Sequence, residues 1–169
     1  RLGLAATAEE KTELLRRIAQ LEDERLRDPA KAFDALARLA PLAPDDALVR
    51  GRLLELVEPT GRAEAASDVL ARTAEAAEGA ALRAEILTER AKLLEERLGD
   101  AAGALAVYGA IFALAPQDPE LALPAARAQD RLLTQADEPA RLREVLYAEV
   151  RLDEDVAHKR DLYGRIGVL

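Results

Sequence analysis

The sequence predicts an all-α array of stacked helix pairs, and three observations lead to this fold class. Ala, Leu, Glu and Arg dominate the 169 residues, and these side chains lose little conformational freedom in a helix. Aromatic residues make up only 3% of the chain, which is therefore poor in residues that favour strands. Finally, apolar residues recur at helical spacing, and the sequence resembles itself at a fixed offset.

The self-similarity defines two long copies. Residues 24–30 (ERLRDPA) resemble residues 96–102 (ERLGDAA), which lie 72 positions later, and the same offset relates the two Leu-Ala-Pro segments. Further along, residues 68–70 resemble residues 144–146 at an offset of 76. Four additional residues, about one helical turn, therefore enter the second copy, and we place them near 119–124.

Local signals predict where the helices begin and end. In the second copy, apolar residues at helical spacing predict one helix over 82–98 and another over 104–114. Between them, Gly99 suits the left-handed position after a helix, and Asp100 can cap the next helix. The sequence therefore predicts a tight turn at this point.

Proline and aspartate predict the boundaries that follow. Pro44 and Pro116 end the second helix of a pair, with Asp46 and Asp118 as the next N-caps. Proline is tolerated in a first turn but is costly in a helix interior. We therefore expect Pro124 to begin the next main helix, with residues 119–122 forming an extra turn or a loop.

This pattern resembles the tetratricopeptide repeat family, whose unit is a helix–turn–helix of about 34 residues. The resemblance is carried by Gly99, Asp100, Ala104, Tyr108 and Pro116, and more loosely by Asp28, Ala32, Leu36 and Pro44. It implies a right-handed superhelical solenoid of antiparallel helix pairs, with about eight to nine helices here. A HEAT-like array, which has longer units, is the alternative.

The resemblance also implies a domain organisation. We expect one helical-repeat domain over residues 1–169, a fragment of a longer array because the last helix stops at Leu169 within its apolar pattern. The expected repeat units span residues 13–46, 47–84, 85–122 and 123–160, and a further unit starts at 161–169.

The same resemblance implies a binding groove lined by the first helix of each pair. The family's inward-facing positions predict these partner-binding residues: Leu14, Arg17, Leu21, Glu24, Ile86, Glu89, Leu93, Glu96, Leu162 and Arg165. Their mixture of apolar and charged side chains suits an amphipathic peptide or helix. A register shifted by one residue would instead place the leucines in the core and the charges on a solvated rim.

The residues needed for catalysis or for a cofactor are scarce. The chain has no cysteine, and its only histidine, His158, is expected at a helix N-terminus or an exposed turn. The only serine, Ser67, lacks the Gly-x-Ser-x-Gly motif of a nucleophile elbow and is expected on a helix surface. We therefore expect no catalytic, cofactor-binding or metal site, and a protein that is not an enzyme.

Charge and composition narrow the class of partner. The net charge of −8 argues against nucleic acid, which binds basic surfaces. No apolar run approaches the roughly 20 residues that span a bilayer, so we expect no membrane insertion. The chain has no asparagine, so a partner must be held by arginine, by carboxylates and by apolar contacts. The expected partner is a protein or peptide.

The sequence thus predicts a non-catalytic protein-interaction or scaffold module. A purely structural spacer within a larger protein is the alternative, and an enzyme-associated domain is the remote one. The apolar residues at the last helix predict self-association of that end. Because the chain begins with Arg1 and not Met, we expect its true start to be missing. The sequence does not determine the cellular compartment, although the cytoplasm is slightly favoured.

Overall fold

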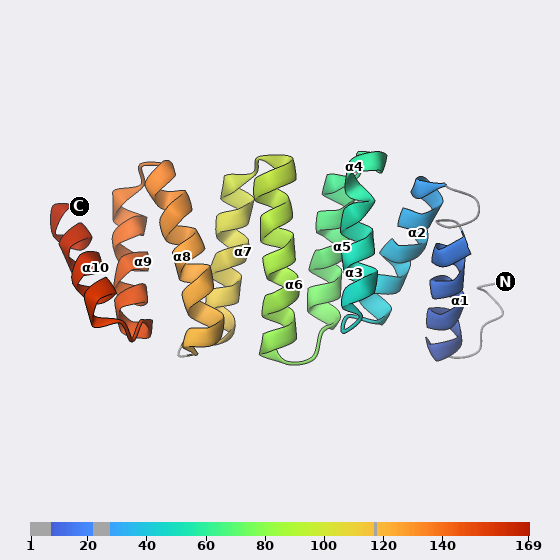
Figure 1. Cartoon of the computed structure of the whole chain (residues 1–169), viewed down its shortest axis with the longest axis horizontal. Helices are drawn as coiled ribbons and strands as arrows, with labels where there is room; N and C mark the ends of the chain where they lie inside the picture. Colours follow the sequence, from blue (N-terminus) through green and yellow to red (C-terminus); the bar gives the residue numbers. More distant parts are fainter. Residues whose placement is uncertain (1–7, 22–27, 117) are drawn as a thin grey trace. The chain divides into compact units, whose positions relative to one another are not determined.

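The computed structural model describes residues 8–21, 28–116 and 118–169, and all regular elements in these ranges are helical (Figure 1). The all-α part of the prediction is therefore confirmed. The chain divides into two compact units, Arg1–Ile86 and Leu87–Leu169, which we call the N-terminal and the C-terminal unit.

The N-terminal unit begins with α1 (Ala8–Leu21), α2 (Pro29–Leu39) and the short helix η3 (Ala40–Leu42). It continues with α3 (Ala47–Glu55), α4 (Val57–Thr60) and α5 (Ala63–Ala76). The helix α6 (Ala80–Leu93) contains the boundary between the units. The C-terminal unit then holds the π-helical turn η4 (Leu94–Leu98), α7 (Ala101–Leu114), α8 (Pro119–Gln135), α9 (Pro139–Leu152) and α10 (Val156–Val168).

The helix boundaries repeat at the offsets found in the sequence. α1 and α6 have the same length and begin 72 residues apart, while α5 and α9 have the same length and begin 76 residues apart. The backbone agrees as well, because Gly61 and its equivalent Asp137 are both left-handed, with φ of 65° and 54°. We call the segment from α1 to α5 the first copy and that from α6 to α9 the second; α10 is equivalent to α1 and α6.

The four additional residues of the second copy lengthen α8. Where the first copy has α3 and α4 with a break between them, the second has one continuous helix of 17 residues. Val49, Arg50 and Val57 are buried in the first copy, and so are their equivalents at the later offset, Ala125, Ala126 and Leu133. The extra residues therefore form the first helical turn of α8.

The prediction that Pro124 begins the main helix is wrong. α8 begins at Pro119, and Pro124 lies inside it. A proline at this position removes the hydrogen bond to the carbonyl of Glu120, four residues earlier. Both residues are exposed, so water can satisfy that carbonyl, and Pro119 provides a favourable first position.

The predicted caps are confirmed. The carboxylates of Asp46, Asp100 and Asp118 each accept a hydrogen bond from a backbone N–H in the first turn of α3, α7 and α8. Gly99 is left-handed with φ of 63° at the end of η4, as the Leu98-Gly99-Asp100 turn requires. Each cap satisfies an N–H or C=O group that a helix end leaves unpaired.

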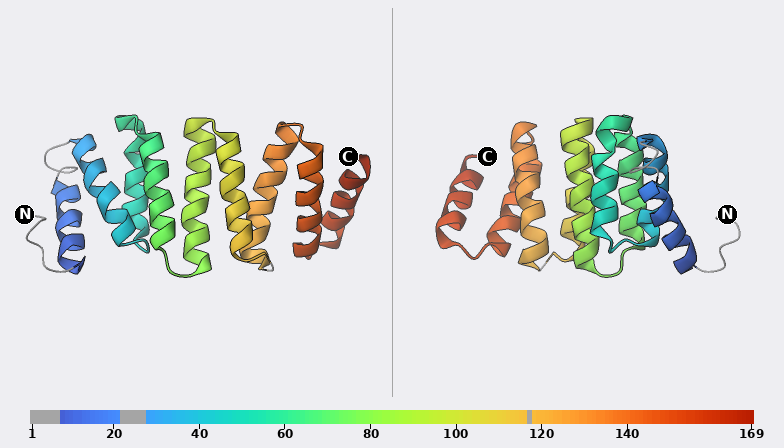
Figure 2. Two further views of the ribbon diagram at one scale, coloured as in Figure 1. Left: turned by 180° about the vertical axis from the view of Figure 1, so that it is seen from behind. Right: turned by 45° about the vertical axis from the view of Figure 1, so that its right-hand side comes forward.

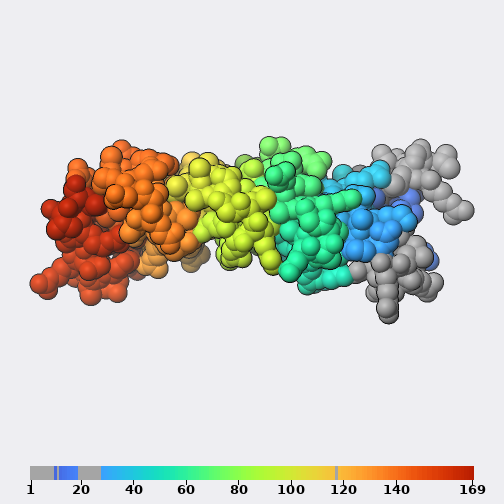
Figure 3. Space-filling view, turned by 90° about the horizontal axis from the view of Figure 1, so that it is seen from above, coloured from blue at the N-terminus to red at the C-terminus, as the bar shows by residue number. Residues whose placement is uncertain are grey.

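Within each unit, successive helices pack side by side. α1 packs on α2 in the N-terminal unit, and α8 packs on both α7 and α9 in the C-terminal unit, where α9 also contacts α10 (Figure 2). In the space-filling view, the atoms of the orange and red segments that follow α7 lie against one another on the face shown (Figure 3). Ala32 and Ala104 are fully buried, so they allow neighbouring helices to approach closely.

Two further observations concern the described residues. Ser67, expected on a helix surface, is buried in α5, so that expectation is wrong: its neighbours Ala66, Val69 and Leu70 belong to the core face. None of the described helices combines the length and the low charge needed to cross a membrane.

Candidate functional site

The helix α10 is a basic segment on an acidic chain. Asp155 caps its N-terminus, because its carboxylate accepts hydrogen bonds from the backbone N–H groups of Ala157 and His158. Lys159, Arg160 and Arg165 outnumber the single acid of the helix, Asp161, although the whole chain has a net charge of −8. Because Arg165 pairs with Asp130, and the exposed acids Glu154 and Asp155 precede the helix, Arg160 is the exposed basic side chain with which α10 can contact an acidic group.

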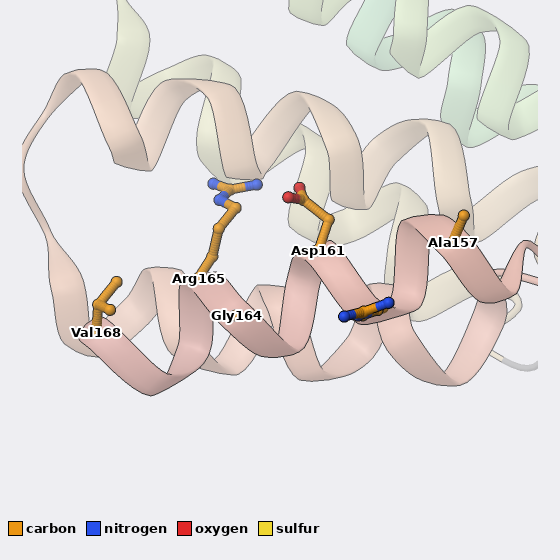
Figure 4. Close-up of a pocket in the computed structure, with 6 residues that line it drawn as sticks. Ala157, Asp161, Gly164, Arg165 and Val168 are labelled. Atoms are coloured by element: carbon orange, nitrogen blue, oxygen red, sulfur yellow. The ribbon is translucent and has the colours of Figure 1, made fainter.

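One side of α10 presents a shallow, wide-open groove of about 500 Å³, and all of its lining residues belong to α10. It is lined by residues that recur at helical spacing: Ala157, Arg160, Asp161, Gly164, Arg165 and Val168. Figure 4 shows the labelled residues along one side of the helix, with the side chains of Asp161 and Arg165 extending in the same direction. Gly164 contributes no side chain, so the helix backbone is accessible at the middle of the groove.

A pair of hydrogen bonds fixes Arg165 in this groove. Its guanidinium donates to both carboxylate oxygens of Asp130 on α8, at 2.7 and 2.5 Å. The hydroxyl of Thr134 donates to the same carboxylate at 3.1 Å. The hydrogen bond with Asp130 raises the pKa of Arg165 above its ordinary value, so this side chain stays charged.

A second polar contact holds the start of α10. The buried carboxylate of Asp153 accepts hydrogen bonds from the backbone N–H of Asp155, from Arg127 on α8 and from the ring of His158. These bonds, that of the Asp155 backbone first, hold the pKa of Asp153 well below its usual range. The contact joins α8, the turn after α9 and α10, and His158 lies near a helix N-terminus as expected.

A buried acid lies between these two contacts. Glu149 on α9 is only 1% exposed, and its Oε1 has no hydrogen-bond partner. Burial, followed by repulsion from Asp130, raises the pKa of Glu149 to about 7. The equivalent residue in the first copy is Thr73, whose hydroxyl donates to the carbonyl of Val69 at 2.8 Å. An ionisable side chain at this buried position therefore occurs in the second copy and not in the first.

The helix α10 also exposes apolar residues. Val156 is 80% exposed, Tyr163 is 56% exposed and Val168 is 87% exposed. Arg160 and Gly167 of α10 are exposed. Their equivalents in α6, Ala84 and Ala91, are both buried. A face that is covered in an equivalent helix is thus open to solvent in α10.

The partner-binding residues predicted from the sequence occupy three equivalent helices. On α1, Leu14 is half-buried and Arg17 is exposed; Leu21 ends the helix, but its side chain and the whole of Glu24 lie outside the described residues. On α10, Leu162 is fully buried, and Arg165 is the half-buried partner of Asp130.

The predicted residues of the α6 segment divide in the same way. Ile86 and Leu93 are buried, Glu89 is half-buried, and Glu96 in η4 is exposed. Ile86, Leu93 and Leu162 therefore contribute to the core of this chain. The charged residues of the predicted set are more exposed to solvent than these three. The role of the set in binding a partner stays a prediction.

Sequence reasoning missed the acidic groups that lie between α8, α9 and α10. Asp130, Glu149 and Asp153 lie on three different segments, and their proximity depends on how α8, α9 and α10 pack. The one available signal was the repeat itself, since Glu149 replaces a threonine and Asp153 an alanine of the first copy.

No protein-family model matches this chain, and no curated protein is significantly similar to its sequence. Within the residues that the structure describes, no group of three or more His, Cys, Asp or Glu side chains is placed to hold a metal ion.

Proposed function

We propose that this chain is a non-catalytic protein-interaction module that binds an acidic, amphipathic helix or peptide along α10. The observation that carries the proposal is the open face of α10, where the exposed side chains of Arg160, Val156 and Tyr163 occur together. Tyrosine and arginine are the residue types most often found at the centre of protein interfaces.

The energetics favour such a contact. Fully burying a side chain such as Val156 contributes roughly 1.5–3 kcal/mol of hydrophobic stabilisation. Arg160 makes no ion pair with any described residue, so its charge is available to an acidic partner. The ion pair between Arg165 and Asp130 anchors α10 to α8, and a rigid helix loses little entropy on binding.

We propose further that the helix pairs stack as a solenoid of the tetratricopeptide kind. The support is the recurrence of helix lengths and left-handed turns at the offsets of the sequence repeat. Small-angle X-ray scattering tests this, because a stacked array has a radius of gyration well above the roughly 15 Å of a globular domain of this size. A value close to that of a globular domain would refute the solenoid.

The binding function is tested by affinity capture with matched variants. The immobilised chain is compared with the double variant Arg160→Glu/Tyr163→Ser and with the control Arg143→Glu, which changes an equally exposed charge on α9. Proteins retained from an extract of the producing cells are quantified by mass spectrometry. We expect the control to retain the same proteins as the unaltered chain and the double variant to lose them.

Two outcomes would contradict the proposal. If the double variant retains the same proteins in the same amounts, α10 is not the binding surface. If the unaltered chain retains no protein specifically, the structural-spacer role is favoured instead. Circular dichroism of each variant verifies that helix content is unchanged, as expected for substitutions of exposed residues.

A further inference from the structure

A small apolar pocket lies between α7, α8 and α9 in the C-terminal unit. Its volume is about 200 Å³, and its apolar lining consists of Phe112, Ala126, Val145 and Ala148. Gln129, Glu144 and Arg151 complete the lining. The pocket is separate from the α10 groove, with which it shares no residue.

The repeat explains why a pocket exists here. In the N-terminal unit, η3 packs directly on α5. The equivalent of η3 in the second copy is the end of α7, which includes Phe112, and the equivalent of α5 is α9. Among the described residues there is no comparable packing between α7 and α9. The copies also differ in volume, because Ala126 stands where the first copy has the fully buried Arg50. The smaller side chain at position 126 is one source of the space at this site.

The charged residues at the pocket are available to a partner. Glu144 and Arg151 are exposed, and neither forms an ion pair with another described residue. They lie seven residues apart on α9, so their Cα atoms are separated by roughly 10 Å along the helix axis. Between them, the pocket is open to a side chain that approaches across α9.

We propose that this pocket receives one aromatic side chain from a partner helix that carries a basic residue opposite Glu144 and an acidic residue opposite Arg151. A site of about 200 Å³ is too small for most drug-sized ligands, whose pockets measure about 300–1,000 Å³. It is of the right order for a single ring, since an apolar cavity of about 150 Å³ binds benzene. Phe112 at its wall offers an aromatic contact.

The inference deepens the protein-interaction role and depends on that role, but it concerns a different surface. An aromatic anchor in a preformed pocket with flanking charges is the arrangement by which a few residues carry most of the binding energy. The α10 face and this pocket are changed by different substitutions, so failure at one is distinguishable from failure at the other.

The experiment uses three synthetic helical peptides of 17 residues, each with a lactam bridge on the face away from the contact. The first carries Lys, Phe and Glu at positions j, j+4 and j+7; the second replaces Phe by Ala; the third replaces Glu by Lys. Fluorescence anisotropy measures their dissociation constants. We expect the Phe peptide to bind at least about 10-fold more tightly than the Ala peptide, as for loss of a buried aromatic anchor.

Two variants of the chain locate the binding. Ala148→Leu fills the pocket from α9 and should abolish the difference between the Phe and Ala peptides, whereas the control Ala106→Leu, at an exposed position of α7, should retain it. Arg151→Glu places two acids at the rim and should reverse the preference, so that the peptide with two lysines binds more tightly than the one with Glu.

The proposal is overturned if the Phe and Ala peptides bind equally to the unaltered chain. It is also overturned if Ala148→Leu, verified as folded by its thermal transition, binds the Phe peptide as tightly as before. Should that variant not fold, Arg151→Glu still decides, because it alters only an exposed residue: an unchanged order of peptide affinities would refute the assigned contacts.

Discussion

Replacing Glu149 by glutamine should stabilise the protein at pH 8 and have little effect at pH 5. The side chain is 1% exposed, and its Oε1 lacks a hydrogen-bond partner. Its charged neighbours are Asp130 and Arg127 from α8, and His158 and Arg165 from α10. Burial and Asp130 raise the pKa of Glu149, and the three basic groups only partly offset them.

The sign and size of the effect follow from linkage. The pKa of Glu149 rises from an ordinary 4.5 to about 7, so the folded chain binds this proton more tightly than the unfolded chain does. Its contribution to the free energy of unfolding is therefore most favourable below pH 4.5 and declines until the pH exceeds about 7. A shift of this size corresponds to about 3 kcal/mol at most. Glutamine has a similar shape and does not titrate, so it avoids this loss.

The assay is urea unfolding followed by circular dichroism at several pH values between 5 and 8, on the unaltered chain and on Glu149→Gln. The difference in unfolding free energy should grow with pH, to about 2–3 kcal/mol at pH 8. Glu144→Gln, at an exposed position of the same helix, serves as the control and should show no such growth. A difference that is constant with pH, or an unaltered chain that is the more stable at pH 8, would refute the reasoning.

Three further predictions concern stability and the pKa of Glu149. Gly51→Ala should raise the unfolding free energy by up to about 1 kcal/mol, because a Cβ there meets nothing within 4 Å in a helix, whereas Gly61→Ala should lower it by about 1 kcal/mol, because φ is 65°; equal effects in urea unfolding would contradict this. Asp100→Ala should cost about 1 kcal/mol through loss of the α7 cap, and an unchanged urea midpoint would argue against that cap. Asp130→Asn should lower the pKa of Glu149, visible as a shift of its carboxyl resonance titration in NMR to lower pH, and an unshifted or higher titration would exclude the proposed repulsion.

Local structure followed the sequence closely. The caps at Asp46, Asp100 and Asp118 and the left-handed Gly99 depend only on residues within one turn, so residue type and spacing were enough to predict them. The offsets of 72 and 76 residues also reappear in the helix boundaries, because equivalent sequences form equivalent helices.

Two predictions failed because they weighed one residue type without its surroundings. Pro124 lies inside a continuous helix because Pro119 begins it and both Pro124 and Glu120 face solvent. Ser67 is buried because the apolar residues beside it turn that face of α5 toward the core. Neither outcome is visible from the local preference of one residue type, which tertiary packing overrides.

The candidate surfaces likewise separate what the sequence determines from what only the packing of several helices determines. The sequence by itself determined the helical class, the internal repeat, the helix ends and the surplus of acidic residues, since these depend on composition and on spacing along the chain. Only the tertiary structure decided that Glu149 is buried between α8 and α10, that Arg165 is held by Asp130, and that a pocket opens between α7 and α9. Burial and ion pairing are properties of several helices at once, so the order of residues in one helix cannot specify them.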